Sequence, residues 1–130
     1  DVEAGLLEIA LERQVLVMER LFLSESLPVI YSTNIIPSDL LNESPLISAV
    51  IVSIYDFLHT YAGQDIHYST TDISAQVPVG EIAAGLQLAP CTPILKFTDV
   101  FFNRSEQPVA LGENFFNEKI LGMRLVRQRS

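Results

Sequence analysis

The sequence predicts an α+β domain: an antiparallel sheet of about six strands flanked by short helices. A pattern typical of strand, tight turn and strand occurs over residues 19–29 and again over 99–109, and each copy follows a short Ile-Ala helical fragment. Such an internal repeat indicates one sheet made of two related halves, with a cavity where they meet. The length of 130 residues, 48% of them apolar, suits a single domain with a packed core over residues 1–130.

The first half of the chain is predicted to contain a hairpin between two helices. Residues 2–10 place their apolar side chains on one side of a short helix. Residues 14–23 and 28–35 are rich in β-forming side chains on either side of a Ser-Glu-Ser turn, so they predict the first hairpin. Residues 53–61 have apolar side chains at i, i+3, i+4 and i+7, which is typical of an amphipathic helix, and Gly63 is expected to end it.

The second half repeats this plan and adds strands at its beginning and end. Residues 66–77 alternate enough to form a half-buried strand, and residues 80–87 predict a second short helix. The second hairpin is expected over 93–103 and 107–116, and residues 121–128 predict a last strand. No linker or low-complexity segment divides the sequence, which favours one domain.

The balance of charge argues against direct binding of nucleic acid by this chain. Its formal net charge is −8, whereas a nucleic-acid-binding domain needs a basic face. Arg124, Arg127 and Arg129 form a basic run, which we interpret as a solvated strand edge or tail rather than a phosphate site. The longest strongly apolar stretch, residues 46–52, is far shorter than the roughly 20 residues that a membrane helix needs, so we expect no membrane association.

Cysteine usage and the start of the chain bear on its cellular context. Cys91 is the only cysteine, so the sequence offers no disulfide framework and favours the reducing cytoplasm. It lies in a turn between two prolines, and we interpret it as a packing residue rather than a nucleophile. Asp1 and Glu3 stand where a signal peptide would carry basic residues. Because the chain begins with Asp instead of Met, we expect it to be a piece of a longer protein.

Candidate catalytic and metal-binding residues are few. His59 and His67 have no His or Cys partners at the spacing of a metal site, so we interpret them as surface residues and expect no metal or other cofactor. The sequence also lacks a Gly-rich phosphate loop, a nucleophile elbow and a Cys-x-x-Cys pair. The pattern therefore predicts a protein that is not an enzyme.

Two features are typical of a binding site instead. Arg20 lies in a strand that is otherwise largely apolar, where its guanidinium must be paired or face a wet cavity. Ser53 begins a helix and is followed by Tyr55, and the free amides of a helix N-terminus favour anions. A structural ion pair at Arg20 and an ordinary N-cap at Ser53 stay open as purely structural interpretations, unless the fold brings the two features together.

The order of these short motifs resembles one known family. Glu-Arg-Leu at 19–21, Leu-Pro-Val at 27–29, Ser-Ile-Tyr-Asp-Phe-Leu at 53–58 and the second hairpin over 101–108 closely resemble the UTRA domain. UTRA is the effector-binding domain of HutC-type GntR-family bacterial transcription regulators. The likeness covers residues 8–127, and its specificity lies in the ordered set rather than in any single motif.

The resemblance implies a chorismate-lyase-like fold, an antiparallel sheet with helices, and binding of a small molecule without turnover. It also implies a cytoplasmic homodimer with a winged helix-turn-helix domain upstream of this chain, so that DNA is bound by that domain and not by this one. Effector binding would then change the affinity for the operator, because a ligand shifts an equilibrium toward the state that it binds better.

The resemblance also carries a set of site residues over to this sequence. Sugar-phosphate-responsive members hold their ligand with two arginines, a Ser and a Tyr at a helix start, two glutamates and a further tyrosine. Arg20 matches the first arginine, and Ser53 with Tyr55 matches the helix-start pair. The other four positions are replaced in this chain. The predicted ligand-binding residues are Arg20, Phe22, Ser32, Ser53, Tyr55, Ala110 and Phe116.

The replacements predict a pocket that is more apolar than a sugar-phosphate site, since poorly paired hydroxyls would each cost about 1–3 kcal/mol. We expect a smaller or more apolar effector with one anionic group, a carboxylate or a monophosphate, held by Arg20 and the amides near Ser53. Glu113 lies close to a replaced glutamate, but a shift in alignment would be needed to bring it in. Two alternatives stay open: a dimerisation module whose pocket is closed by Phe22 and Phe116, and a chorismate-lyase-like enzyme.

Overall fold

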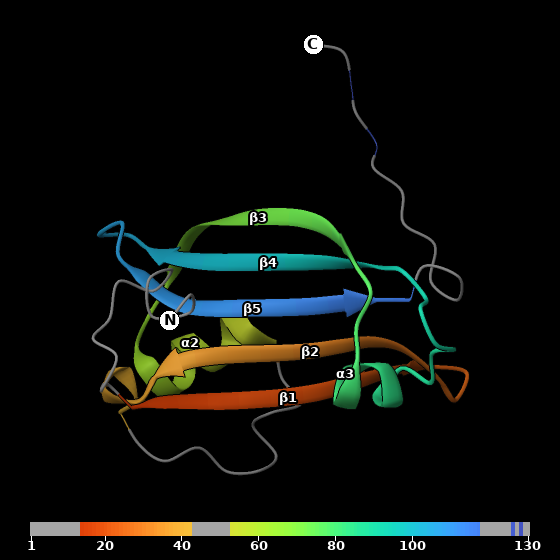
Figure 1. Ribbon diagram of the computed structural model, residues 1–130. Helices are drawn as coiled ribbons and strands as arrows, with labels where there is room; N and C mark the ends of the chain where they lie inside the picture. Colours follow the sequence, from red (N-terminus) through yellow and green to blue (C-terminus); the bar gives the residue numbers. More distant parts are fainter. Residues whose placement is uncertain (1–13, 43–52, 118–125, 127, 129–130) are drawn as a thin grey trace.

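The computed structural model of the protein describes residues 14–42 and 53–117, together with Val126 and Gln128 (Figure 1). These residues form one five-stranded sheet in the order β1-β2-β5-β4-β3, and each neighbouring pair of strands is antiparallel. The α+β class and the antiparallel sheet are therefore confirmed. In chain order the strands are β1 (Val15–Ser24), β2 (Leu27–Pro37), β3 (Ile66–Gln76), β4 (Ile94–Asn103) and β5 (Pro108–Phe116).

The two predicted hairpins form as expected, and they join at the centre of the sheet. β1 and β2 are connected at Glu25 and Ser26, whose φ angles of 50° and 70° belong to the turn class that follows the twist of a sheet. Between β4 and β5, the side chain of Asn103 accepts hydrogen bonds from the amides of Ser105 and Gln107. β2 of the first hairpin then pairs with β5 of the second.

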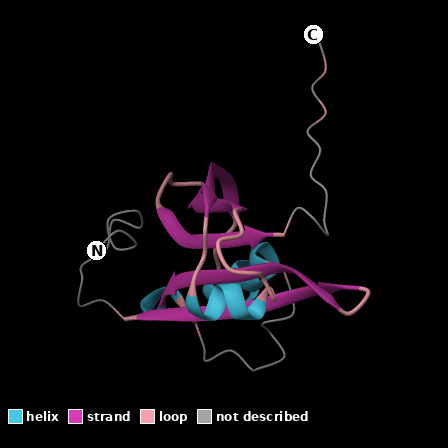
Figure 2. Ribbon diagram, turned by 45° about the vertical axis from the view of Figure 1, so that its right-hand side comes forward, coloured by secondary structure: helices cyan, strands magenta, loops and turns pink. Residues whose placement is uncertain are grey.

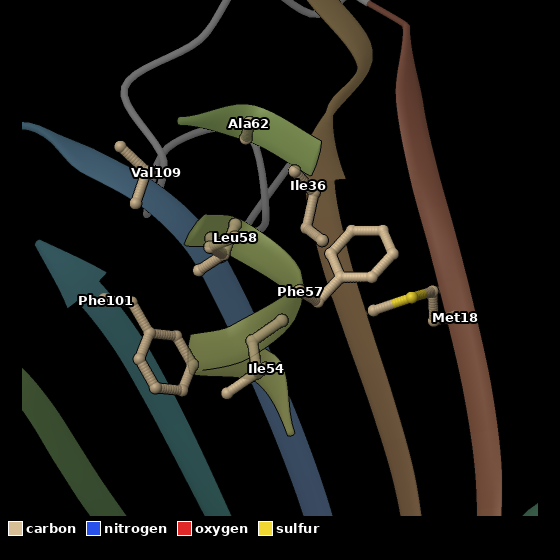
Figure 3. Close-up of a cluster of buried hydrophobic side chains, with 9 residues drawn as sticks. Met18, Ile36, Ile54, Phe57, Leu58, Ala62, Phe101 and Val109 are labelled. Atoms are coloured by element: carbon tan, nitrogen blue, oxygen red, sulfur yellow. The ribbon is translucent and has the colours of Figure 1, made fainter. Parts of the chain in front are cut away.

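α2 (Ile54–Ala62) packs its apolar side against one face of the sheet (Figure 3). The helices lie close against the strands of the sheet in Figure 2. Phe57 and Leu58 are fully buried in this contact. Burying a side chain of that size contributes about 1.5–3 kcal/mol, so the contact fixes the position of the helix on the sheet. The buried cluster consists of Met18, Ile36, Ile54, Phe57, Leu58, Ala62, Phe101, Val109 and Ala110.

α3 (Gly80–Gly85) lies on the opposite face, against β2 (Figure 1). Leu86, Ile94 and Phe115 are buried there with the ring of Tyr31 packed against them. Side chains of a strand alternate between the two faces, so these residues do not share a face with the α2 cluster. The helix ends at Gly85, earlier than the sequence predicts, and Gln87 just beyond it has a φ of 55° that no helix permits.

Two predicted elements fall on parts of the chain that are not described. The first helix, over 2–10, lies outside the described residues. The last strand, over 121–128, does so too apart from Val126 and Gln128. The 3-10 turn η1 (Ser38–Leu40) follows β2 directly.

The sheet face that carries α2 changes from apolar to polar along its strands. β1 presents Met18, Arg20 and Phe22 on this face in turn, and β4 presents Phe101 and Asp99. Met18 and Phe101 belong to the buried cluster under α2. Arg20 and Asp99 lie beyond it, so the polar side chains gather at the N-terminal end of this helix.

Candidate functional site

A cavity of about 260 Å³ lies on the α2 face of the sheet, beside the first turn of the helix. All five strands contribute to its lining, and most of the lining side chains carry a hydroxyl, an amide or a charge. A concave site with several convergent polar groups is suited to binding a small molecule. The lining residues are Arg20, Ser32, Asn34, Ile54, Tyr55, Ser69, Thr71, Asp99, Phe101 and Asn114.

The strand register explains why residues so far apart in sequence meet here. Arg20 on β1 pairs with Ser32 on β2, and Ser32 pairs with Asn114 on β5. Asp99 on β4 pairs with Thr71 on β3. Facing side chains on adjacent strands have Cβ atoms about 4.5–5.5 Å apart, so the polar residues form a continuous band across the sheet.

Arg20 occupies one side of the cavity. Its Nη2 donates a hydrogen bond to Oδ1 of Asn34 at 2.8 Å, and its guanidinium carbon lies 5.3 Å from the centre of the Phe22 ring. Asn34 is 3% exposed, so the bond is anchored on a buried side chain. Burial lowers the pKa of Arg20, but a guanidinium keeps its proton at neutral pH. This side of the cavity can therefore bind a carboxylate or a phosphate.

Asp99 occupies the other side. Oγ1 of Thr71 donates to Oδ1 of Asp99 at 2.6 Å, and Nδ2 of Asn114 donates to Oδ2 at 3.1 Å. Each carboxylate oxygen thus accepts one hydrogen bond and keeps a further lone pair for another donor. The two bonds fix the plane of the carboxylate toward the cavity that it lines.

Gly112 lies between the two sides of the cavity in the strand register. On β5 it pairs with Asn34 in one direction and with Asp99 in the other. A Cβ atom at this position would lie 3.1 Å from Nδ2 of Asn34 and 3.5 Å from Oδ2 of Asp99. A Cβ atom here would therefore press on the amide of Asn34 and make an ordinary contact with Asp99, and the tight approach to Asn34 accounts for glycine in the middle of a strand.

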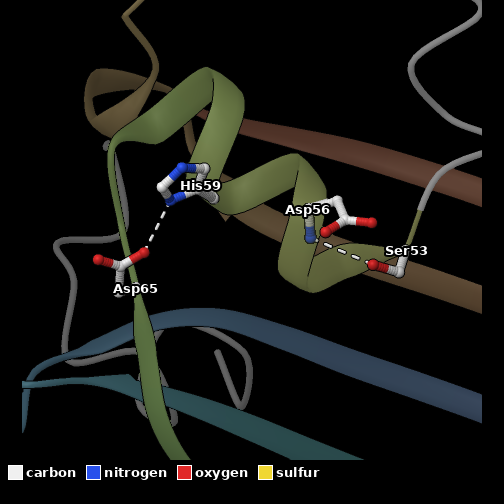
Figure 4. A network of polar contacts seen from close by, with 4 residues as sticks. All are labelled: Ser53, Asp56, His59 and Asp65. Atoms are coloured by element: carbon white, nitrogen blue, oxygen red, sulfur yellow. Dashed lines mark hydrogen bonds and ion pairs between the residues drawn. The ribbon is translucent and has the colours of Figure 1, made fainter.

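The first turn of α2 forms the wall of the cavity. Ile54 is buried, whereas Tyr55 is 52% exposed and meets the ring of Phe101 edge-on, with ring centres 5.7 Å apart. Ser53 precedes this turn, and its Oγ accepts a hydrogen bond from the amide of Asp56 at 3.1 Å (Figure 4). The positive end of the helix dipole thus adjoins the cavity and adds to its attraction for an anion.

Three of the residues predicted to bind ligand are brought together. Arg20, Ser32 and Tyr55 line the cavity from β1, β2 and α2. Ser32 is buried beneath it, whereas Tyr55 stands at its exposed edge. The two features that sequence reasoning could not connect, the strand arginine and the helix start, thus belong to one cavity.

The other four predicted residues do not line the cavity. Ser53 caps α2, and Ala110 lies in the buried cluster beneath that helix. Phe22 contacts the guanidinium of Arg20, and Phe116 packs against Phe97. Because the expectation of a more apolar pocket depended on Phe22, Ala110 and Phe116, the observed lining is more polar than the sequence predicts.

Glu113 faces away from the cavity. It lies next to Asn114 on β5, so alternation sends its side chain to the other face of the sheet. There its Oε2 lies 3.7 Å from Nζ of Lys96. Glu113 therefore takes no part in this site.

Sequence reasoning missed most of the polar lining, because these residues are dispersed over four strands. Each of them shares the sheet face of Arg20, and this common face is a signal that alternation within the strands could have given. The pairing between β2 and β5 is needed to bring them together, and that pairing joins segments far apart in the chain. The missed polar residues are Asn34, Ser69, Thr71, Asp99 and Asn114.

A second hollow, of about 190 Å³, lies between the end of α2 and the β4–β5 turn, lined by Gly63, Gln64, Asp65, Asn103, Arg104 and Ser105. Beside it, Nδ1 of His59 lies 2.7 Å from Oδ1 of Asp65, and both side chains are mostly exposed (Figure 4).

Within the described ranges, no three His, Cys, Asp or Glu side chains gather as a metal site would require. None of the described helices has the length and apolar character needed to span a bilayer.

The family follows from comparison with known proteins. Residues 1–120 match the family model of the UTRA domain. The chain belongs to the UTRA domain family. No curated protein shows significant similarity to the sequence.

Solved structures share the fold of this UTRA domain. A GntR-family transcriptional regulator from Enterococcus faecalis is 22% identical with a TM-score of 0.83, over 95% of this chain and 88% of that one. The effector domain of PhnF from Mycobacterium smegmatis is 18% identical with a TM-score of 0.85, over 99% and 79% of the two chains. The possible transcriptional regulator YydK from Bacillus subtilis is 18% identical with a TM-score of 0.82, over 98% of this chain and 56% of that one.

Proposed function

We propose that this UTRA domain senses a small molecule with an anionic group, bound in the cavity beside α2, and thereby controls DNA binding by a GntR-family regulator of the HutC type. The observation that carries the proposal is the position of Arg20. Arg20 lines the cavity, and its guanidinium is held by the buried Asn34. The first turn of α2 lines the same cavity. A fixed cation next to the positive end of a helix dipole favours a carboxylate or a phosphate.

The size and lining of the cavity restrict the effector further. A volume of about 260 Å³ is below the 300–1,000 Å³ of sites that enclose drug-sized ligands, so the effector is a small metabolite. Hydroxyls and amides of Ser32, Ser69 and Asn114 offer hydrogen bonds to its polar part. Tyr55 and Phe101 offer apolar surface at the edge.

Membership of the family supports a regulatory role. The structure of PhnF that this chain resembles is described as an effector domain. The likeness to YydK covers 56% of that chain, which leaves length there for a further domain. We place a winged helix-turn-helix domain on the same polypeptide as this domain, and we expect a cytoplasmic homodimer in which it binds the operator. The net charge of −8 fits a domain that does not itself contact DNA.

The alternatives have less support. A dimerisation module with a closed pocket would have the cavity filled by its own side chains, yet Phe22 and Phe116 lie outside the cavity lining. A chorismate-lyase-like enzyme would need more than one anion-binding group for its substrate. Within the described part of the chain, Arg20 is the one cationic residue that lines the cavity.

The test is ligand-induced stabilisation of this chain. A panel of short carboxylates, amino acids and phosphorylated metabolites would be compared by thermal unfolding and isothermal titration calorimetry. A ligand at 100 times its dissociation constant stabilises the folded state by about 2.7 kcal/mol. We expect Arg20→Ala to abolish this stabilisation. Arg104→Ala, which removes a cation from the exposed β4–β5 turn, is the matched control and should leave it unchanged.

Two results would contradict the proposal. One is a panel in which no member stabilises the wild-type chain. The other is a ligand whose affinity is the same for the wild type and for Arg20→Ala, because this would place the anion somewhere else.

A further inference from the structure

We propose that the effector is a zwitterion, and that Asp99 binds its cationic group while Arg20 binds its acid. The inference rests on the proposed function and adds the chemical class of the ligand. It concerns a carboxylate that the likeness to the family did not assign to the site.

The surroundings of Asp99 support binding of a cation. Its two oxygens accept hydrogen bonds from Thr71 and Asn114, both of which are neutral donors. Among the described residues, no ion pair is formed by Asp99. A half-buried carboxylate without a cationic partner gains most from a ligand that brings a positive charge, since charge-assisted hydrogen bonds are roughly twice as strong as neutral ones.

The balance of charge in the lining points the same way. Arg20 is the cation and Asp99 the carboxylate among the residues that line the cavity. An anion without a positive group would be attracted by Arg20 but repelled by Asp99. A zwitterion satisfies both charged groups at once, and such complementarity favours it over ligands with one charge.

The geometry also limits how far apart the two ligand groups lie. Nη2 of Arg20 contacts Oδ1 of Asn34, so the charge of Arg20 lies over β2. Asp99 is on β4, with β5 between them, which makes a separation of about 10 Å for two strand spacings. Hydrogen bonds of about 3 Å at each end leave at least about 4 Å between the charged groups of the ligand, and more where the bonds do not lie along the line between the two side chains. This separation fits an amine and an acid joined by a short chain better than an α-amino acid.

The strand between these two groups carries no side chain at the position where they meet. Gly112 lies between Asn34 and Asp99 in the register, and a Cβ atom there would already come within 3.1 Å of Nδ2 of Asn34 and 3.5 Å of Oδ2 of Asp99. The methylene groups of the ligand would cross the sheet above these two side chains. Tyr55 and Phe101 would contact these methylene groups from the side of α2.

The experiment compares one zwitterion with three probes, each of which differs from it at only one end. They are 5-aminopentanoate, 5-hydroxypentanoate, pentanoate and pentylamine, each titrated by calorimetry into the wild-type chain. We expect 5-aminopentanoate to bind about 10- to 100-fold more tightly than the other three, because only this probe can bring charge to both ends. 4-Aminobutanoate and 6-aminohexanoate test the spacing in the same way.

Variants then locate the amine. Asp99→Asn keeps the size of the side chain and removes its charge, so the preference for 5-aminopentanoate over 5-hydroxypentanoate should disappear. Glu113→Gln removes a carboxylate from the opposite face of the sheet and should keep the preference. The comparison of probes on the wild type tests whether a zwitterion is preferred even if Asp99→Asn does not fold.

The outcomes separate this inference from the proposed function. Equal affinity of pentanoate, 5-hydroxypentanoate and the amino acids, with binding lost in Arg20→Ala, would overturn the zwitterion and keep the anion sensor. A preference for the amine that survives in Asp99→Asn would overturn the role of Asp99. If neither these probes nor the wider panel binds to the wild type, both the proposed function and this inference fail.

Discussion

Arg20 on β1 and Asn34 on β2 are joined by a hydrogen bond of 2.8 Å from Nη2 to Oδ1. Arg20 pairs with Ser32 in the register, so its side chain reaches two residues along β2 to meet Asn34, the next residue on the same face. Asn34 is 3% exposed and cannot follow a moving partner into solvent. The bond therefore holds the guanidinium over β2, on the cavity side of the sheet.

The first prediction concerns this pair. We expect Asn34→Ala to lower the free energy of unfolding by about 1–3 kcal/mol, because it removes a buried polar partner from the guanidinium. The loss should be smaller when Arg20 is already alanine, since the two side chains share an interaction. Urea unfolding of the wild type, both single variants and the double variant measures this coupling. Strictly additive losses would show that the bond does not contribute to stability.

The second prediction concerns Gly112, which lies between Asn34 and Asp99 in the register. A Cβ atom there would meet Nδ2 of Asn34 at 3.1 Å and would displace this amide, which holds the guanidinium of Arg20. We expect Gly112→Ala to weaken binding of the effector at least tenfold, or about 1.4 kcal/mol, while the chain stays folded. Calorimetric titration of the best ligand from the panel, together with the thermal unfolding midpoint, measures both effects.

Gly85 offers a matched control for Gly112. A Cβ atom at Gly85 would approach the ring of Tyr31 at 3.0 Å, which is a similar crowding on the opposite face of the sheet. Gly85→Ala should therefore change stability without changing affinity. Equal affinity of the wild type and Gly112→Ala would mean that the position of the Asn34 amide does not affect ligand binding.

The fold could be predicted to the extent that it depends on local sequence. The turn between β1 and β2 and the end of α2 at Gly63 follow from a few adjacent residues, and both are confirmed. The predicted helix over 80–87 was wrong by two residues, since α3 ends at Gly85. The left-handed conformation of Gln87 has no clear signal in the local sequence. The pairing of β2 with β5 does not depend on local sequence. It joins Ser32 to Asn114, and no pattern within either strand specifies the other as its neighbour.

The third prediction compares two aromatic residues of α2. Phe57 is fully buried beneath the helix, and Tyr55 is 52% exposed at the cavity. We expect Phe57→Ala to lower the free energy of unfolding by about 3–5 kcal/mol, as for other large core residues. Tyr55→Ala should cost much less stability but weaken ligand binding. Urea unfolding and calorimetry on both variants would separate the two roles.

An opposite pattern would contradict the arrangement of α2. If Tyr55→Ala unfolded the chain as readily as Phe57→Ala, the face that α2 turns to the sheet would be misplaced. Unchanged affinity in Tyr55→Ala would remove its ring from the binding site.

The site was harder to predict than the fold, because its residues are brought together only by the register of the strand pairs. Arg20 was conspicuous as a charge in an apolar strand, and it lines the cavity. Asp99 was not, because a carboxylate in a half-exposed strand is common on a solvated face. Its position opposite Arg20 depends on three strand pairings at once. The resemblance to the family transferred seven ligand-binding positions to this sequence. Three of them hold side chains that pack outside the cavity lining: Phe22, Ala110 and Phe116.

The last prediction concerns the phenol of Tyr31, which lies on the face opposite the cavity and donates a hydrogen bond to Oε2 of Glu19. This bond, burial and the negative charges of Glu19 and Glu81 raise the pKa of Tyr31 to about 12. The protonated phenol is favoured in the folded state, so its contribution to stability is present below pH 10, the usual tyrosine value. It is lost as the pH rises through about 12. Ultraviolet absorbance of tyrosinate follows the titration directly.

We expect Glu19→Gln to bring this pKa down toward 10, because the largest cause of the shift is the hydrogen bond to an ionised carboxylate. Tyr31→Phe identifies the step that belongs to Tyr31, since the chain has four tyrosines. The ring itself should keep its place against Gly85 in both variants, because that contact is apolar. A titration curve of Glu19→Gln that coincides with the wild type would show that the carboxylate does not hold the phenol in solution.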